Sequence, residues 1–368
     1  MTDPETRLTP LRRAQMPRLP DALGGSAAGA GPAHSTIVDF VTAAARRGTE
    51  PRDPQAIADI HAPGARVFDD VRLRHGTDEI TEGPDLVLSV PGEVIPGAEH
   101  VIWAGDAGTG FHTSHRMPMV ARRVRADEDD DDDDAHRASG RVGNRDVLVI
   151  ANGLVRDGAF HVVHVLRNTA ALLLADGRDP MEEAARAVRD GLPDWPRDAA
   201  TWDALRMAAA PSTPLHLGEP VEGFDPDRFT REVHQRIWAL GDVSAPLDYH
   251  AADIRFEGPS LRHGVGMDAH AAMTAAIRAE LSQIAFRTDD VFWTTDADGV
   301  LRLATRWSMD AVHSGDLAYG QATGAAVQIW GITQSEVIGG RIVAEWMLFN
   351  EFDVMMQIAA ARIDGRTG

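Results

Sequence analysis

A carboxylate and a histidine stand at matching places in two related stretches of the chain. SLRHG at 260–264 repeats RLRHG at 72–76, and a short strand ending in Glu257 or Asp69 precedes each motif. A carboxylate and a histidine held close together can take a proton from a substrate and return it. The sequence therefore makes Glu257 and His263 the candidate catalytic pair.

Several other chemistries lack the residues that they need. The chain has no cysteine, so disulfides, thiolate metal sites and cysteine nucleophiles are excluded. His112 and His115 are three apart on a predicted strand and point to opposite faces, so they do not predict a metal site. No phosphate loop, HExxH helix or serine elbow is present. No metal ion and no cofactor are expected.

Composition restricts the partners and the location of the protein. The formal net charge is −20 and every basic residue is arginine, which disfavours binding to nucleic acid. No run reaches the roughly 18 apolar residues of a membrane span, and the N-terminal stretch does not resemble a secretory signal. Together with the lack of cysteine, these features favour a cytoplasmic protein without a membrane partner.

The repeat extends through most of the 368 residues, a length that suits two domains. Each half is expected to open with a helix, over 37–47 and 225–240, and to continue into long alternating strands with glycine turns. A further helix is expected over 268–284. Helices followed by antiparallel hairpins predict an α+β fold. The matched residues are His61 with His250, His75 with His263, Arg116 with Arg306, Gly158 with Gly340, and Asn168 with Asn350.

The composition along the chain sets the expected domain boundaries. An irregular segment covers 1–35, and the first domain covers 36–190. The acidic run at 127–134 is expected to be a solvated loop within the first domain. A segment rich in proline and turn residues links the two domains over 191–224, and the second domain covers 225–368.

The stretch RWSMDAVHSGDLAYGQATGAAVQIWGITQSEVIGGRIVAEWMLFN resembles the C-terminal half of SnoaL-like polyketide cyclases and ester cyclases, within the nuclear transport factor 2-like superfamily. The similar features are an arginine-led strand, a histidine followed by a glycine turn, a threonine-glycine pair, and a glycine turn before a tryptophan strand. The resemblance implies two cone-shaped domains, each a curved mixed or antiparallel sheet wrapped over helices around an apolar pocket. Single-copy relatives pair through their sheets, so an intramolecular pseudo-dimer is expected, and a homo-oligomer is open.

The resemblance also implies where a site would lie. In the family's cyclases an acidic residue directly follows the tryptophan and acts as acid or base, but here Met347 stands at that place, as does Val165 in the first copy. Family members bring a polar residue inward at the end of the first strand, which is Glu257 here. The residues expected to bind a substrate are Trp307, Trp330, Trp346, Arg306 and Glu345.

Structural roles compete with these assignments. The arginine and histidine of the LRHG motif could stabilise the strand-to-helix turn, and Arg306 and Arg116 could pair with carboxylates on the outer sheet face. Glu345 would point away from the pocket if Trp346 points into it, because strand side chains alternate.

Two functions from different classes follow. The first is a cofactor-independent acid–base enzyme, of the isomerase, cyclase or hydrolase type, that acts on a small apolar metabolite. The second is a non-catalytic protein that binds a small molecule or serves as a scaffold. Burial of Glu257 with a raised pKa would favour the enzyme, and exposure or pairing with an arginine would favour binding.

Overall fold

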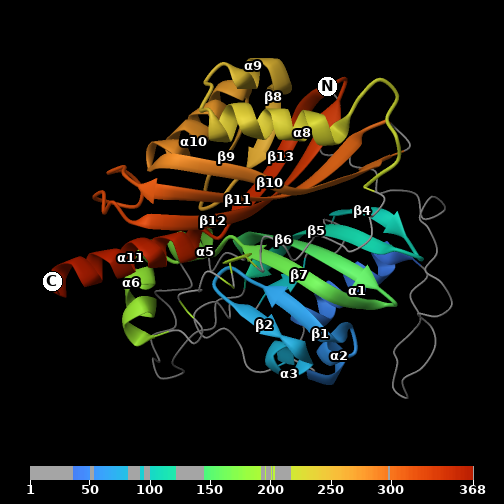
Figure 1. The fold of residues 1–368 in the computed structure, drawn as a ribbon, viewed down its shortest axis with the longest axis horizontal. Coiled ribbons are helices and arrows are strands. Elements are labelled where there is room, and N and C mark those ends of the chain that lie inside the picture. The colour runs from blue at the N-terminus through green and yellow to red at the C-terminus, as the bar shows by residue number, and fades with distance from the viewer. Residues whose placement is uncertain are drawn as a thin grey trace, which may run out of the picture.

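The computed structural model describes residues 36–49, 54–81, 92–94, 100–121, 145–191, 195, 200, 202–203, 217–296 and 299–367. The expected N-terminal segment, the acidic loop and most of the linker lie outside these residues. The described part consists of two mixed sheets with helices packed on them, so the predicted α+β class is confirmed (Figure 1). None of the helices in this part is long and apolar enough to cross a membrane.

The first sheet and its helices, called the first unit below, come from residues 36–191. Its seven strands follow the order β2-β1-β7-β6-β5-β3, with β4 also paired to β5. The strands are β1 (His61–Phe68), β2 (Leu73–His75), β3 (Gly92–Val94), β4 (His100–Asp106), β5 (Gly110–Ala121), β6 (Arg145–Arg156) and β7 (Ala159–Arg167). The helices are α1 (Ile37–Thr49), α2 (Pro54–Ala58), α3 (Gly76–Thr81), α5 (Thr169–Ala175) and α6 (Pro180–Asp190).

The second sheet and its helices, called the second unit, come from residues 217–367. Its six strands follow the order β10-β11-β12-β13-β8-β9. The strands are β8 (His250–Glu257), β9 (His263–Val265), β10 (Leu281–Thr295), β11 (Leu301–His313), β12 (Ala326–Ile338) and β13 (Arg341–Phe349). The helices are α8 (Pro226–His234), the π-helix η4 (Gln235–Ala239), α9 (Ala245–Tyr249), α10 (Met267–Ala279) and α11 (Glu351–Thr367).

The two sheets share one strand order. In each, a short hairpin (β1–β2 or β8–β9) joins the sheet through a parallel pairing with the last long strand, β7 or β13. Arg116 and Arg306 occupy matching register positions, opposite Ile150 and Ile332 respectively. Matched residues of the two units are therefore eight positions closer in sequence after β5 and β11 than at Arg116 and Arg306. In the first unit the sequence between β5 and β6 contains the acidic run.

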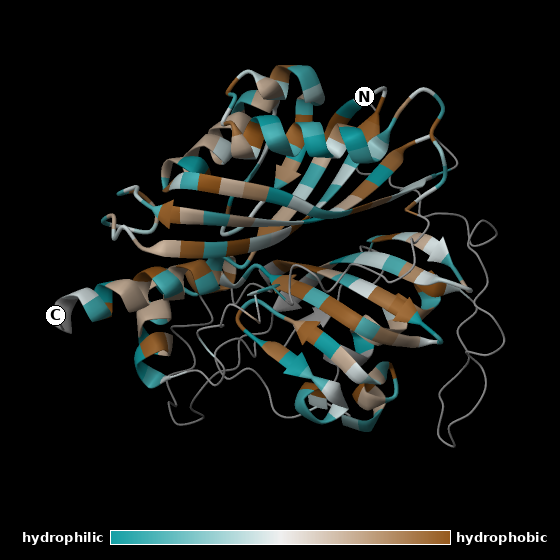
Figure 2. Ribbon diagram, viewed as in Figure 1, coloured by the Kyte–Doolittle hydropathy of each residue, from teal (hydrophilic) through white to brown (hydrophobic). Residues whose placement is uncertain are grey.

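One face of each sheet packs against the other sheet. Buried apolar residues from both units form a shared core there, together with Trp202 of the segment between the units. The residues from the units are Phe68, Leu148, Ile150, Leu154, Val162, Leu166, Trp330, Ile332 and Leu348. Polar contacts cross the same boundary, because Gln334 Nε2 donates to Ser114 Oγ over 2.9 Å. The Arg116 guanidinium lies 3.3 Å from the centre of the Trp346 ring. The sheets thus bury both of their faces, one on the helices and one on each other, and Figure 2 shows bands of apolar and polar residues alternating along the strands.

Helices α10 and α11 both differ from the sequence expectation. The helix expected over 268–284 ends at Ala279, because the Glu280 carbonyl accepts hydrogen bonds from Ser314 N and Gly315 N, at 3.0 and 3.2 Å, and β10 begins at once. Helix α11 was not predicted. It packs on α6 of the first unit (Figure 1), so it links the two units as well as closing the second.

Candidate functional site

Strand alternation divides the polar residues of the second sheet between two environments. Glu257 pairs in register with Trp346, and Trp346 pairs with Gln334, which reaches into the first unit. Register partners share a face, so all three point toward the first unit. Glu345 pairs with Phe256 on the opposite face, toward the helices. Glu345 therefore points into the interior of the second unit, whereas Glu257 does not.

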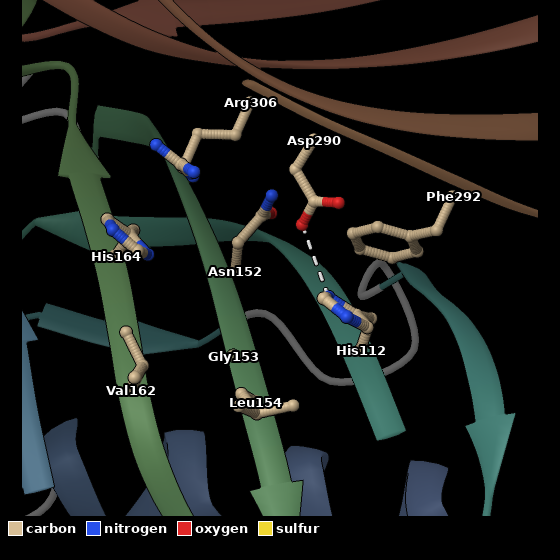
Figure 3. Close-up of a pocket in the computed structure, with 9 residues that line it drawn as sticks. All are labelled: His112, Asn152, Gly153, Leu154, Val162, His164, Asp290, Phe292 and Arg306. Atoms are coloured by element: carbon tan, nitrogen blue, oxygen red, sulfur yellow. Dashed lines mark ion pairs between the residues drawn. The ribbon is translucent and has the colours of Figure 1, made fainter. Parts of the chain in front are cut away.

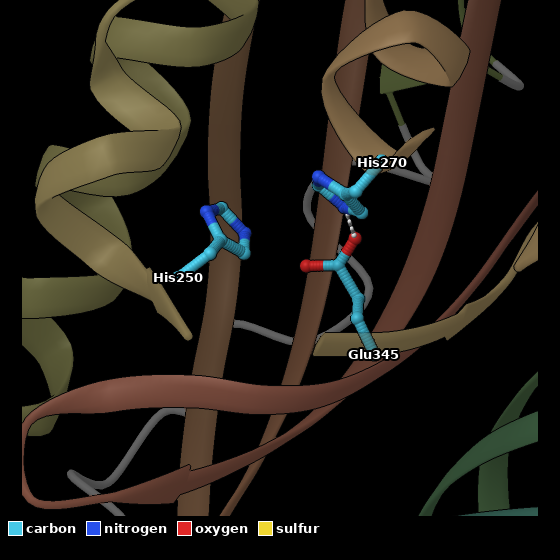
Figure 4. Close-up of side chains that lie close together, drawn as sticks. All are labelled: His250, His270 and Glu345. Carbon is cyan, nitrogen blue, oxygen red and sulfur yellow. Dashed lines mark hydrogen bonds and ion pairs between the residues drawn. The ribbon is translucent and has the colours of Figure 1, made fainter. Parts of the chain in front are cut away.

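Glu345 meets two histidines in that interior (Figure 4). His270 Nε2 lies 2.8 Å from Glu345 Oε1, and the ring of His250 lies 4.5 Å from that of His270, centre to centre. Three elements bring them together, because Glu345 is on β13, His270 on the buried side of α10 and His250 at the start of β8. The exposed fractions are 9%, 2% and 1% for Glu345, His270 and His250, so solvent barely reaches the cluster.

Burial and mutual charge set the protonation of this cluster. Burial alone would raise the pKa of Glu345, but the charge and hydrogen bond of His270, with His250 and His234 nearby, lower it to about 2. Burial lowers the pKa of His234 to about 4, against the opposing pull of Glu345. Burial and the neighbouring His270 lower the pKa of His250 to about 4, while Glu345 and the backbone of Pro246 oppose this. The Glu345 carboxylate thus lies near the neutral imidazoles of His234 and His250 at neutral pH.

An aromatic wall adjoins the interior cluster. Trp307 stacks on Phe286 and Trp238, with ring centres 5.3 and 6.1 Å apart, and its Nε1 donates to Thr333 Oγ1 over 3.0 Å. The ring lies so close to Gly331 that a Cβ there would approach it to 2.1 Å. Trp238 belongs to the π-helix that follows His234, and such local π-turns are frequent at functional sites.

A second polar site lies between the units (Figure 3). His112 Nδ1 lies 3.2 Å from Asp290 Oδ2 across the boundary, and Arg306 pairs with Asp289 at 3.1 Å. Asn152 points into the small cavity that these residues enclose. The cavity volume is about 10 Å³, which holds roughly one water molecule. The site is thus a polar contact between the units.

The site residues proposed from the sequence lie in two different environments, the interior of the second unit and the boundary between the units. Trp307 and Glu345 lie in the interior of the second unit, whereas Trp330, Trp346 and Arg306 face the first unit. Glu257 shares that outer face with Arg116 of the first unit. Burial lowers the pKa of the Arg116 guanidinium to about 10, and the nearby charges of Glu336 and Glu257 oppose this lowering. The expected place of Glu257 at the pocket mouth is therefore wrong, because Glu257 lies on the face opposite to the buried Ile254 and Phe256. The catalytic roles assigned to Glu257 and His263 stay predictions, although His263 is exposed on β9.

The matched motif that singled out His263 has a clear structural contact. Arg262 donates from Nη1 to Glu351 Oε1 over 2.7 Å, and Ser260 Oγ donates to Glu351 Oε2 over 2.6 Å. Asn168 of the first unit donates to the carbonyls of Gly258 and Ser260. The turn after β8 is thus attached to α11 and to the first unit. Register also makes Phe68, rather than Asp69, the counterpart of Glu257.

His270 was not predicted as a site residue, and His250 had no predicted role. His270 lies on one side of α10 with Met273, Thr274 and Ile277, all buried. A lone histidine on the apolar side of a predicted helix was the available signal. His250 had been matched to His61 without a function.

The fold and the interior cluster define an α+β unit with a buried, ionisable centre under one face of its sheet. Residues 229–358 match the family model of SnoaL-like polyketide cyclase, which covers about a third of the chain and all three cluster residues. This confirms the resemblance for the second unit. The search of curated proteins found no match.

Solved structures show the same likeness at low identity. A candidate polyketide cyclase from Acidithiobacillus ferrooxidans is 18% identical over 39% of this chain and 99% of its own, with a TM-score of 0.32. IdmH, a candidate polyketide cyclase from Streptomyces antibioticus, is 17% identical over 37% and 99%, with a TM-score of 0.32. An epoxide hydrolase from M. tuberculosis is 15% identical over 38% and 93%, with a TM-score of 0.28. Likenesses this weak carry no conclusion of their own.

The buried histidines predict an acid-sensitive fold. His234 is 6% exposed, and its pKa is about 4 in the folded chain against a usual 6.5. Between these values the unfolded chain binds a proton that the folded chain does not, so the free energy of unfolding falls as the pH is lowered from 7 to 4. We expect a loss of up to about 3 kcal/mol from His234. Denaturant unfolding at several pH values measures it.

A matched pair of variants isolates this contribution. His234→Gln should flatten the pH dependence between 4 and 6.5, whereas His75→Gln, at an exposed position, should leave it unchanged. Equal slopes for wild type and His234→Gln would show that His234 is not held neutral by the fold.

Proposed function

We propose that this protein is an acid–base enzyme that moves a proton on a small apolar metabolite, with its chemistry in the second unit. The observation that carries the proposal is the buried 2.8 Å contact between His270 Nε2 and Glu345 Oε1. Support for the class comes from the match of this segment to the SnoaL-like polyketide cyclase family. The reaction type is isomerisation, cyclisation or hydrolysis, and proton transfer itself requires only these side chains.

The roles of the two residues follow from their contact. Glu345 is ionised, since its pKa is about 2, and accepts the Nε2–H of His270. This fixes the tautomer and leaves Nδ1 as the basic nitrogen. His270 Nδ1 is buried without a hydrogen-bond partner, so it is free to take a proton from a bound molecule. His270 is the general base, and Glu345 is the residue that positions it.

The same contact accounts for the missing acid of the family pattern. Met347 occupies the place after the tryptophan, and Glu345 lies two positions earlier on the same strand. Residues two apart on a strand share a face. The Glu345 carboxylate therefore points into the same interior as the Met347 side chain. In the proposed dyad it acts on the substrate through His270.

Only the second unit holds such a dyad at these register positions. Val163 and Val165 of β7 match Glu345 and Met347, because Gly153 pairs with Val163 as Ser335 pairs with Glu345. Valine carries no proton. We therefore assign the first unit a structural role, as the partner in an intramolecular pseudo-dimer whose shared core supports the sheet that bears the dyad.

Substrate entry requires movement next to the cluster. Helix α9 contacts β8, β13 and α10, which carry the three cluster residues. The segment from η4 to α9 exposes Leu240, Val243 and Leu247 to solvent. Displacement of this segment would open a path from an apolar surface to His270, which suits an apolar substrate.

The experiment is proton exchange in D2O with a panel of small ketones and 1,3-dicarbonyl compounds, followed by mass spectrometry. The proposal predicts that the wild-type protein, dialysed against a chelator, incorporates deuterium next to a carbonyl of at least one compound about a hundredfold faster than buffer. Binding of panel compounds without any exchange would contradict it and support the second function, a non-catalytic small-molecule-binding protein.

A further inference from the structure

The interior cluster has the donor set of a metal site. His250, His270 and Glu345 each offer one ligand atom, and these atoms all lie within 4.8 Å of one another. They come from separate elements, β8, α10 and β13, so the fold itself brings them together. Figure 4 shows the three side chains converging on a common space.

Unpaired nitrogen atoms lie in this cluster. Neither ring nitrogen of His250 has a hydrogen bond of normal geometry, and His270 Nδ1 also lacks one. Both histidines are almost fully buried, at 1% and 2% exposed. Buried polar atoms are nearly always satisfied in native proteins, and a bound ion or water molecule is a common reason for an exception. The unpaired nitrogens therefore point to a ligand that binds imidazole.

We propose that His250, His270 and Glu345 bind one divalent transition-metal ion. Two imidazole nitrogens and one carboxylate oxygen suit zinc and the neighbouring first-row ions, and leave open a position for water or a substrate oxygen. The inference concerns the same side chains as the proposed dyad but does not depend on catalysis.

The geometry requires a small adjustment. Tetrahedral zinc with bonds of about 2.0–2.1 Å holds its ligand atoms about 3.3 Å apart. The ligand atoms at up to 4.8 Å must therefore approach by about 1.5 Å, within reach of side-chain rotation. The backbone of Pro246 also lies against the His250 ring, where a metal-bound histidine commonly directs its other nitrogen.

Metal binding and the proposed dyad use the same two side chains, His270 and Glu345. A bound ion would occupy a nitrogen lone pair of His270 and a carboxylate oxygen of Glu345, and both side chains would then be unavailable for proton transfer. An occupied site should therefore exchange substrate protons more slowly than the metal-free protein.

The test titrates chelator-treated full-length protein with Zn²⁺ by calorimetry, and with Co²⁺ by visible absorption, which reports the coordination geometry. The wild type should bind one equivalent at this site. His250→Gln, His250→Phe and Glu345→Gln should each weaken that binding at least a hundredfold, while His75→Gln, at an exposed histidine, should bind as the wild type does. Circular dichroism confirms that each variant is folded.

The two proposals fail separately. Zn²⁺ binding that survives both His250 variants and Glu345→Gln, or no binding at all, overturns the metal site whatever the exchange assay shows. Loss of metal binding in these variants supports the metal site, whatever the exchange assay shows. Failure of the metal-free wild type to exchange protons would contradict the proposed function but not the metal site.

Discussion

Replacing Glu345 by glutamine is expected to lower proton exchange about a thousandfold. The amide keeps the shape of the side chain but removes the charge that favours the Nε2–H tautomer of His270, so Nδ1 is no longer the basic nitrogen. Because Glu345 acts through His270 and not on the substrate, kcat should fall with little change in KM. Steady-state kinetics on a compound that the wild type exchanges measures both constants.

The matched control is Glu232→Gln, which changes an exposed glutamate that pairs with Arg228 on α8. It should leave kcat unchanged. The pH profile adds a readout that a merely structural role would not move, since the acidic limb of kcat, where the general base becomes protonated, should shift in Glu345→Gln. A fall in kcat matched by an equal loss of folded protein, with an unshifted profile, would reduce Glu345 to a packing role.

Replacing Trp330 by alanine is expected to lower the free energy of unfolding by about 3–5 kcal/mol. Trp330 is 0% exposed and packs edge-on against His164 of the first unit, with ring centres 5.8 Å apart. It belongs to the core shared by the two sheets, so the cavity left by alanine lies at the boundary between them. Denaturant unfolding followed by fluorescence and circular dichroism measures the loss.

The same variant should also uncouple the two units. Wild type is expected to unfold in one transition because the sheets share a core, and Trp330→Ala in two. Trp330→Phe, which refills part of the space, should recover about half of the lost stability. Separate transitions already in the wild type would show that the sheets do not stabilise each other.

Much of the fold could be predicted from local sequence signals. Glycine turns such as Gly339-Gly340, where both residues have positive φ, and the alternation of β11 to β13 identify hairpins without knowledge of the rest of the chain. The matched halves then indicated a common order of elements. Helix α11 was missed because part of its stabilisation comes from α6, a contact that no local pattern shows.

The site was harder to predict because both faces of the second sheet are buried. Because neither face contacts water, apolar residues occur on both faces of the strands. The alternation therefore does not show which residues point toward the helices and which toward the other sheet. Trp346 was expected to line the pocket, which would turn Glu345 outward, and Glu257 was expected to point inward because of the family resemblance. In the structure Trp346 packs under Arg116 of the first unit, so the phase is reversed and Glu345 is the interior carboxylate.

The central claim is that His270 takes a proton from a substrate inside the second unit. The most direct test compares deuterium incorporation by wild type and His270→Gln, at saturating concentrations of the panel compound that the wild type exchanges fastest. The account predicts that His270→Gln binds this compound with similar affinity but exchanges it at least a hundredfold more slowly. An unchanged exchange rate in a folded His270→Gln protein would contradict the account.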